Sequence, residues 1–292
     1  MSGPSAAGAC RALPPMPAAD PLGALLEPFD PVDAALAERR SLLQRADTKF
    51  LLDVRALGRA LGPLASAYAV LLAGGERVAR YETLYYDVPS LRGFDDHARG
   101  RAPRHKVRAR HYPDRALCFL EVKSRTNRGT TGKARRPHPF GEPSLSTEEQ
   151  AWALGITGWT GPLSAQAWTR CRRITLLGLE ADERVTVDLD LRVERPPCAR
   201  RLDGLAIVEV KQARPDPRSP AVQALRRAGA RAGSVSKYAV AMGLLAAGVR
   251  RNRLLPTLRE IGRYGTWQSS SARIGSSTAA TSSSSCPGSP WT

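Results

Sequence analysis

The most regular feature of the chain is a series of short segments in which apolar and polar residues alternate. Alternation with a period of two is typical of a β-strand that buries one face. Gly74-Gly75 and Pro113-Asp114 lie between neighbouring segments and predict two hairpins. Strands are predicted over residues 48–53, 67–72, 77–87, 104–112, 116–126, 167–177, 183–193 and 205–212.

Fewer segments have the spacing of a helix. Ser146 with Glu149 three residues later is a capping-box pattern, and Ser219-Pro220 is a typical helix start. Either Ser234 or Ser236 can cap the last helix. About eight antiparallel strands surrounded by helices predict an α+β fold, as a closed barrel or two facing sheets. Helices are predicted over residues 54–64, 146–154, 219–233 and 234–247.

The two ends of the chain differ from the middle. Residues 1–32 are rich in Ala, Pro and Gly, and residues 263–292 are rich in Ser, so both are expected to be disordered. The folded domain is therefore expected at residues 33–262. The most apolar run, residues 239–249, is too short to span a bilayer. The five cysteines form no CxxC pair, and no signal peptide is evident, which favours a cytoplasmic protein without a zinc site.

The formal net charge is +17, which indicates a polyanionic partner: nucleic acid, an anionic membrane surface or a phosphate polymer. Most of the cations are Arg, and Lys is scarce. Because Lys offers a compact point charge and Arg a rigid fork, we expect the few lysines to have particular roles. The lysines are Lys49, Lys106, Lys123, Lys133, Lys211 and Lys237.

Four predicted strands carry charge on one face and apolar side chains on the other. A solvated sheet face is the usual explanation for this pattern. If the sheet closes with its apolar faces under helices, however, the charged faces turn toward one another and require an ionic guest. A phosphate chain with a divalent cation satisfies charges of both signs. The aligned residues are Lys106, Arg108 and Arg110; Glu121, Lys123 and Arg125; Glu209 and Lys211; and Arg184, Thr186, Asp188 and Asp190.

Several short motifs in a shared order resemble the VTC domain of polyphosphate polymerases over residues 40–260. This family belongs to the triphosphate tunnel metalloenzymes, which resemble CYTH domains. The resemblance implies an eight-stranded antiparallel β-tunnel with surrounding helices. The motifs are Asp47-Thr48-Lys49-Phe50, Tyr81-Glu82-Thr83-Leu84-Tyr85-Tyr86-Asp87, Lys106-Val107-Arg108-Ala109-Arg110, Leu120-Glu121-Val122-Lys123, Arg172-Arg173-Ile174, Arg184-Val185-Thr186-Val187-Asp188, Val208-Glu209-Val210-Lys211 and Ser236-Lys237-Tyr238.

The resemblance also implies a reaction, the transfer of the ATP γ-phosphate onto a growing polyphosphate chain with Mn²⁺ or Mg²⁺. It implies that Lys237 lies near the entering phosphate and that Glu209 holds the metal. Lys106, Glu121 and Lys211 are expected to contribute to the phosphate and nucleotide site, together with Lys133 in a basic loop at residues 133–136. The residues implied to grip the nucleotide phosphates are Lys49, Arg108, Arg110, Lys123, Arg173 and Arg184.

Three other functions stay open from the sequence. A triphosphatase would need the same phosphate clamp but would use water as the attacking group. A sensor that binds polyphosphate or nucleotides would keep the clamp but would not need Glu209. A nucleic-acid-binding protein would cluster Lys and Arg on one exposed helix or loop, whereas here they alternate along strands. The expected partners are thus ATP and polyphosphate, and a membrane-bound partner stays open.

Overall fold

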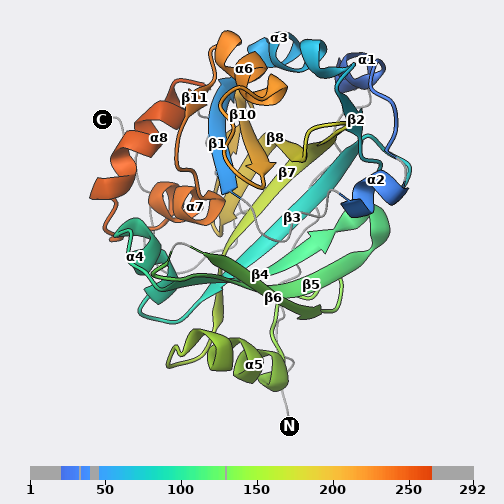
Figure 1. Ribbon diagram of the computed structural model, residues 1–292. Coiled ribbons are helices and arrows are strands. Elements are labelled where there is room, and N and C mark those ends of the chain that lie inside the picture. The colour runs from blue at the N-terminus through green and yellow to red at the C-terminus, as the bar shows by residue number, and fades with distance from the viewer. Residues whose placement is uncertain (1–20, 33, 40–45, 129, 265–292) are drawn as a thin grey trace, which may run out of the picture.

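The computed structural model describes residues 21–32, 34–39, 46–128 and 130–264. Its centre is one antiparallel sheet of eleven strands in the order β11-β1-β10-β8-β7-β3-β4-β5-β6, with β2 paired to β7 and β9 paired to β8 (Figure 1). The strands are β1 (Ala46–Asp53), β2 (Tyr68–Val70), β3 (Val78–Asp87), β4 (Arg104–Tyr112), β5 (Leu117–Arg125), β6 (Thr131–Pro137), β7 (Ser164–Gly178), β8 (Glu183–Arg195), β9 (Cys198–Leu202), β10 (Leu205–Gln212) and β11 (Arg231–Ala232).

The helices surround the sheet, and α5 lies on the opposite side of it from α3 and α6 (Figure 1). The predicted capping box of Ser146 and Glu149 is present at the start of α5. The helices are α1 (Pro21–Leu26), α2 (Ala34–Arg39), η1 (Val54–Ala56), α3 (Leu57–Leu61), η2 (Gly62–Leu64), α4 (Arg92–Ala98), η3 (Pro113–Arg115), α5 (Thr147–Thr157), α6 (Pro220–Arg227), α7 (Lys237–Leu245), η4 (Asn252–Leu254) and α8 (Leu255–Gly262).

Two hydrophobic cores cover the outer face of the sheet. In the first, apolar side chains of β1, β10, β8 and β7, such as Phe50 and Val208, pack against α1, α3 and α6. In the second, side chains of β3, β4 and β5, such as Val107 and Leu120, pack against α5 and Trp159. Because side chains alternate along a strand, the polar residues between these positions lie on the opposite, inner face.

One end of the inner face is apolar because α7 packs against it. Tyr238 and Met242 of α7 are buried with Leu51 of β1 and Ile207 of β10. Tyr85 of β3 stacks on Tyr238, with ring centroids 4.9 Å apart. The charged remainder of the inner face therefore begins next to α7 and extends away from it.

The predicted α+β class with an antiparallel sheet is confirmed, but the predicted count of eight strands is wrong. The hairpin of β4 and β5 forms as predicted, with Val107 opposite Val122. The hairpin predicted at Gly74-Gly75 does not form, because β2 pairs with β7 and only Ala73 and Glu76 form a bridge there. Residues 133–136, predicted as a basic loop, belong to strand β6. Among the described residues no pairing joins β6 to β11, so a closed tunnel is not shown.

The expectation that residues 1–32 are disordered is wrong for residues 21–32. Leu22, Leu26 and Phe29 are buried in the first core, where Leu26 is completely inaccessible. Residues 21–32 contain few apolar side chains, but these lie on one side of α1 and the following turn, so that this side packs against the first core. Residues 1–20 and 265–292 lie outside the described residues. No helix in the described part is long and apolar enough to cross a membrane.

Asp190 does not continue the charged face of β8, contrary to the sequence-based expectation. Its φ is 53°, a left-handed backbone conformation, and the pairing of β7 with β8 shifts register between Arg170 and Arg172. As a result, Leu189 packs in the outer core whereas Leu191 packs on the inner face beside α7. Such a bulge moves the following side chains to the other face.

We predict that Gly93→Ala destabilises the protein. A Cβ atom at Gly93 would lie 2.5 Å from the ring of Trp159 and 3.1 Å from the Asp87 carboxylate, so α4 would have to shift. We expect a loss of roughly 1–3 kcal/mol in the free energy of unfolding, measured by urea denaturation. Gly58→Ala in α3 is the control, because nothing lies within 4 Å of its Cβ position and the change should be neutral or stabilising. Equal stability of the two variants would contradict the prediction.

Candidate phosphate-binding site

Strands from opposite ends of the sheet bring charged side chains together on the inner face. Lys49 of β1 donates to the carbonyl oxygen of Val235 at 2.8 Å, and Lys106 of β4 donates to the Ser236 hydroxyl at 2.9 Å. Both contacts meet at the start of α7, so the sheet curls around that point. We call the following set the inner-face cluster: Lys49, Lys106, Arg108, Arg110, Glu121, Lys123, Arg173, Asp188, Glu209, Lys211 and Lys237.

Asp188 of β8 joins two of these cations. The guanidinium of Arg173 donates to both carboxylate oxygens, at 2.5 and 2.8 Å, and the ammonium of Lys237 donates to one of them. Burial alone would raise the pKa of Asp188, but Arg173 and Lys237 outweigh it and hold this pKa far below its usual range. The sequence predicted that Asp188 lies on the charged face but suggested no function for it. In the structure its carboxylate links β8 to β7 and α7.

Glu121 of β5 is the second carboxylate of the cluster and is fully buried. Arg108 donates to it from two nitrogen atoms, at 2.7 and 2.8 Å, and Lys133 of β6 lies 3.4 Å from its other oxygen. Burial opposes ionisation of Glu121, but the attraction of Arg108, Arg110 and Lys133 lowers its pKa to about 2. The half-exposed Lys133 therefore marks the β6 edge of the site.

Glu209 of β10 is the residue predicted to hold a metal. Its carboxylate lies 2.6 Å from the ammonium of Lys211. Burial raises the pKa of Glu209, but Lys211 and Lys49 outweigh it and lower this pKa. Burial in turn lowers the pKa of Lys211 to about 8, against the opposing effect of Glu209.

A divalent cation at Glu209 would need ligands beyond the protein. Among the described residues no group of three or more His, Cys, Asp or Glu could hold a metal. Mg²⁺ is commonly bound through one or two carboxylates together with substrate phosphates and water. The single carboxylate of Glu209 fits that kind of site, in which the phosphate chain supplies the other oxygens.

Several cations of the cluster form no ion pair in the described part of the chain. Lys49 and Lys106 donate hydrogen bonds only to neutral oxygen atoms. Among the described residues Lys123 forms no side-chain hydrogen bond or ion pair, and Glu209 and Asp47 attract it only at longer range. The buried Nε atom of Arg110 has no acceptor. Burial, Lys49 and Lys123 lower the pKa of Lys106 well below its usual value. Cations held so close together in a buried place favour an anion among them.

The remaining predicted residue, Arg184, lies at the start of β8. It is half-buried, and its register partner on β10 is Lys211. By alternation it shares the inner face with Thr186 and Asp188. The structure thus places every predicted site residue on the inner face or at its β6 edge, while their roles in binding or catalysis stay predictions.

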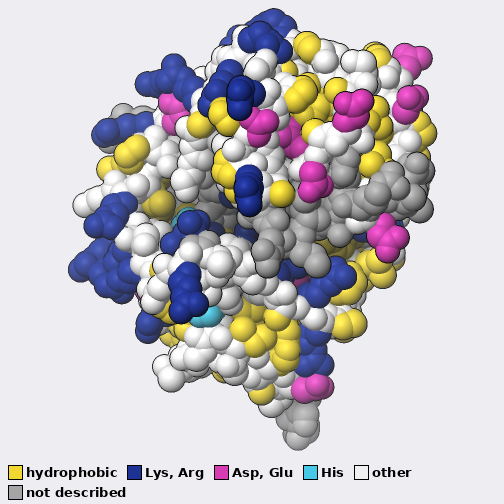
Figure 2. Space-filling view, in the orientation of Figure 1, with side chains coloured by type: hydrophobic (Ala, Val, Ile, Leu, Met, Phe, Trp, Pro, Cys, Tyr) yellow, Lys and Arg dark blue, Asp and Glu magenta, His cyan; other side chains and the backbone are white. Residues whose placement is uncertain are grey.

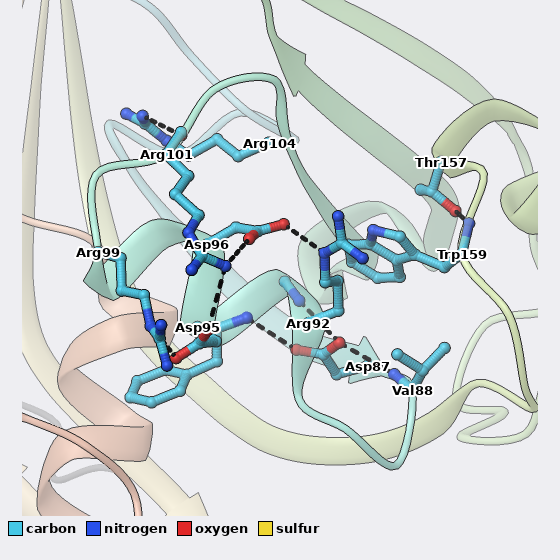
Figure 3. A network of polar contacts seen from close by, with 12 residues as sticks. Asp87, Val88, Arg92, Asp95, Asp96, Arg99, Arg101, Arg104, Thr157 and Trp159 are labelled. Atoms are coloured by element: carbon cyan, nitrogen blue, oxygen red, sulfur yellow. Dashed lines mark hydrogen bonds and ion pairs between the residues drawn. The ribbon is translucent and has the colours of Figure 1, made fainter.

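The start of α7 is held in place by a residue that the sequence did not single out. Asp87, at the end of β3, is fully buried and accepts hydrogen bonds from the backbone nitrogens of Gly93 and Phe94, at 3.0 and 2.9 Å, and from the Tyr238 hydroxyl at 2.8 Å. Figure 3 shows Asp87 at the beginning of α4, beside the ion pairs of that helix. Because Tyr238 follows Lys237, Asp87 positions the cation next to Asp188. Its only signal in the sequence was its place in a family-like motif.

Ser236 caps α7, which confirms one of the two predicted caps. Its hydroxyl accepts from the Ala239 nitrogen at 3.4 Å while it also receives the ammonium of Lys106. Lys237 is the first residue of the helix. The backbone N–H groups of this first turn add to the positive potential of the inner-face cluster.

Positive charge is also present outside the site. Basic side chains, all of them Arg on these two helices, gather over α6 and α8 on the face shown in Figure 2. Arg226 and Arg227 of α6 and Arg259 of α8 are exposed. The net charge therefore does not by itself identify the site, and the inner-face geometry is the more specific signal.

Part of the chain matches a known family. Residues 44–143 match the VTC domain. The resemblance seen in the motifs is thereby confirmed for the segment from β1 to β6, which contains Lys49, Arg108 and Lys123. The motifs between residues 172 and 238 lie beyond the matched segment. No curated protein matches the chain significantly.

Solved structures with similarity to the chain have low identity. HpAC1 from Hippeastrum, described as having a dominant triphosphatase activity, is 15% identical with a TM-score of 0.48, covering 68% of this chain and 96% of its own. The PH1012 protein from Pyrococcus horikoshii OT3 is 15% identical with a TM-score of 0.36, covering 64% and 90%. A conserved protein from Pyrococcus furiosus is 13% identical with a TM-score of 0.35, covering 63% and 91%. At this level of similarity, none of them defines what this chain does.

We predict that Glu121 contributes to the acid sensitivity of the fold. Its pKa is about 2 in the folded protein and near 4.5 when unfolded, so its stabilisation is complete above pH 4.5 and is lost as the pH falls toward 2. The shift corresponds to about 3 kcal/mol. The stability gap between wild type and Glu121→Gln should therefore narrow by about 2 kcal/mol between pH 5 and pH 3 in urea denaturation, and the remainder should be lost as the pH falls below 2. The same change at exposed Glu148 is the control, and a constant gap would contradict the prediction.

Lys123→Met should stabilise the protein without ligand and weaken its binding of phosphate chains. The variant removes an unpaired buried charge but keeps an apolar side chain of similar length, so we expect the free energy of unfolding to rise by roughly 1 kcal/mol. Tripolyphosphate binding should weaken about tenfold or more, as measured by calorimetry. Arg259→Met on α8 is the control, since Arg259 is exposed and lies outside the inner-face cluster. A destabilised Lys123→Met protein with normal binding would overturn this interpretation.

Proposed function

We propose that the inner-face cluster binds the phosphates of ATP and that the protein transfers the γ-phosphate onto a growing inorganic polyphosphate chain. The observation that carries the proposal is the excess of buried cations over carboxylates in one place. Lys49, Lys106, Lys123 and Arg110 form no ion pair with a carboxylate among the described residues, although nearby carboxylates such as Glu209 attract some of them at longer range. A chain of phosphate groups can pair with all of them at once. The match of residues 44–143 to the VTC domain supports the same conclusion.

The transfer requires positioning more than acid–base chemistry. An oxygen of the terminal phosphate of polyphosphate attacks the γ-phosphorus, the bond from that phosphorus to the β-phosphate oxygen breaks, and ADP leaves with the electron pair. The attacking oxygen already carries negative charge, so no side chain has to remove a proton. The cations therefore align the two phosphate chains and neutralise their charge. Lys237, at the start of α7, is proposed to contact the entering chain.

The proposed metal is Mn²⁺ or Mg²⁺, held by Glu209 and by phosphate oxygens. When bound, it would neutralise charge on the group being transferred. Glu209 is suited to this because its lowered pKa keeps the carboxylate ionised near neutral pH. The other expectations from the sequence, a cytoplasmic location and a membrane-bound partner, stay predictions.

Incubation of the pure full-length protein with ATP and Mn²⁺, followed by gel analysis, tests this function. Long polyphosphate chains would support the polymerase, and free phosphate alone would indicate a triphosphatase. Tight polyphosphate binding without turnover would indicate a sensor. Each of the last two results contradicts the proposal.

We predict that Glu209→Gln abolishes the metal-dependent turnover of ATP while the fold stays intact. The amide keeps the shape of the side chain but loses the charge that would attract the metal. Turnover should fall by at least about a hundredfold, and the thermal midpoint reports whether the variant is folded. Glu148→Gln, at an exposed position, should keep full activity. Wild-type activity in a folded Glu209→Gln protein would exclude the metal assignment.

A further inference from the structure

Three aromatic side chains form a row at the end of the inner face that lies away from α7. Tyr81 of β3 and Tyr112 of β4 have ring centroids 5.1 Å apart, and Tyr112 and Phe119 of β5 have centroids 6.2 Å apart. Lys106, which contacts the cap of α7, precedes Tyr112 by six residues on the same strand. At about 3.3 Å per residue the two lie roughly 20 Å apart. We call Tyr81, Tyr112 and Phe119 the aromatic row.

The aromatic row does not serve a hydrophobic core. None of its three residues belongs to the four core clusters of the described chain, and all three are half-buried. Their neighbours on the same strands, Leu84 of β3, Ala109 of β4 and Leu120 of β5, fill the outer core instead. Three adjacent rings on a charged, partly open surface are therefore available to a planar ligand.

Arginine side chains lie over the rings and connect the row to the cationic site. The guanidinium carbons of Arg173 and Arg110 lie 4.5 and 5.7 Å from the centroid of Tyr81. Both residues belong to the inner-face cluster. A ligand whose phosphates lie in the cluster would thus bring its other end to the aromatic row.

Two further arginines lie over the outer rings of the row. Arg115 lies 5.1 Å from the centroid of Tyr112, and Arg135 lies 5.0 Å from that of Phe119. Both arginines are exposed. A base can stack on an aromatic ring or on the plane of a guanidinium group, and this site offers both.

We propose that the aromatic row stacks against the nucleobase of a nucleoside triphosphate whose phosphates occupy the inner-face cluster. This rests on the proposed function, because it takes the cluster as the phosphate site. Lys49 and Lys106 contact the start of α7, Asp188 joins Lys237 of α7 to Arg173, and Arg173 in turn lies over Tyr81 of the aromatic row. In this arrangement the γ-phosphate points toward Lys237 and the base toward the open end. Stacking would favour ATP over inorganic triphosphate, which has no ring.

The test compares the binding of ATP and of inorganic tripolyphosphate to the full-length protein by calorimetry with Mg²⁺. We expect Tyr112→Leu and Phe119→Leu each to weaken ATP binding about tenfold while tripolyphosphate binding stays unchanged. Tyr112→Phe should bind ATP as wild type does, because the ring is kept. Phe140→Leu is the matched control, since Phe140 is 48% exposed and packs beside His111 rather than in the row. Thermal midpoints establish that each variant is folded.

The outcomes separate this proposal from the proposed function. If a Leu variant binds ATP and tripolyphosphate equally more weakly, base stacking is overturned. The rings would then act by positioning the arginines. Unchanged ATP binding in both Leu variants would also overturn it. A wild-type protein that binds neither ligand would overturn both proposals. If wild type binds ATP but makes no polyphosphate, the proposed polymerase function is rejected. The base-stacking proposal is still tested by whether the Leu variants lose affinity for ATP alone.

Discussion

The confinement of many cations to the inner face of one curled sheet is the constraint on which the rest of the structure depends. Lys49, Lys106 and Lys123 come from three different strands yet repel one another. Among the described residues none of the three forms an ion pair with a carboxylate. Their repulsion must therefore be offset elsewhere, and the two outer cores under α1, α3 and α6 and under α5 supply the apolar burial that does this. Apolar packing on the outer face of the sheet thus offsets the electrostatic repulsion on its inner face.

The few carboxylates of the inner face are placed where they do most to hold cations in position. Asp188 accepts from Arg173 and Lys237, and Glu121 from Arg108. Glu121 joins the neighbouring strands β4, β5 and β6, and Asp188 joins β7 and β8 to the more distant α7, so these ion pairs set the geometry of the site as well as its charge. A phosphate chain would compete with these carboxylates for the same donors.

The sequence predicted the strands and their faces better than it predicted their partners. Alternation placed Arg108, Lys123 and Glu209 on the inner face because side-chain direction in a strand is a local property. Strand β6 (Thr131–Pro137) was missed because it has almost no apolar residues and exists through its pairing with β5. The pairing of β2 with β7 was missed because the Gly74-Gly75 signal is local, whereas the sheet order is set by the whole chain.

The same limit explains which parts of the site could be predicted. The scarcity of Lys and its recurrence on alternating positions pointed to charges that face inward, and the structure brings these together. The buried hydrogen bond from Tyr238 to Asp87 and the bulge at Asp190 depend on contacts between distant segments and leave no periodic trace. Asp87 holds the start of α7 through Tyr238. The helix can thereby keep Lys237 next to Asp188 while the apolar side of α7 packs on the sheet. The buried Asp87 carboxylate, which accepts from Tyr238 of α7, thus helps join the hydrophobic core to the inner-face cluster.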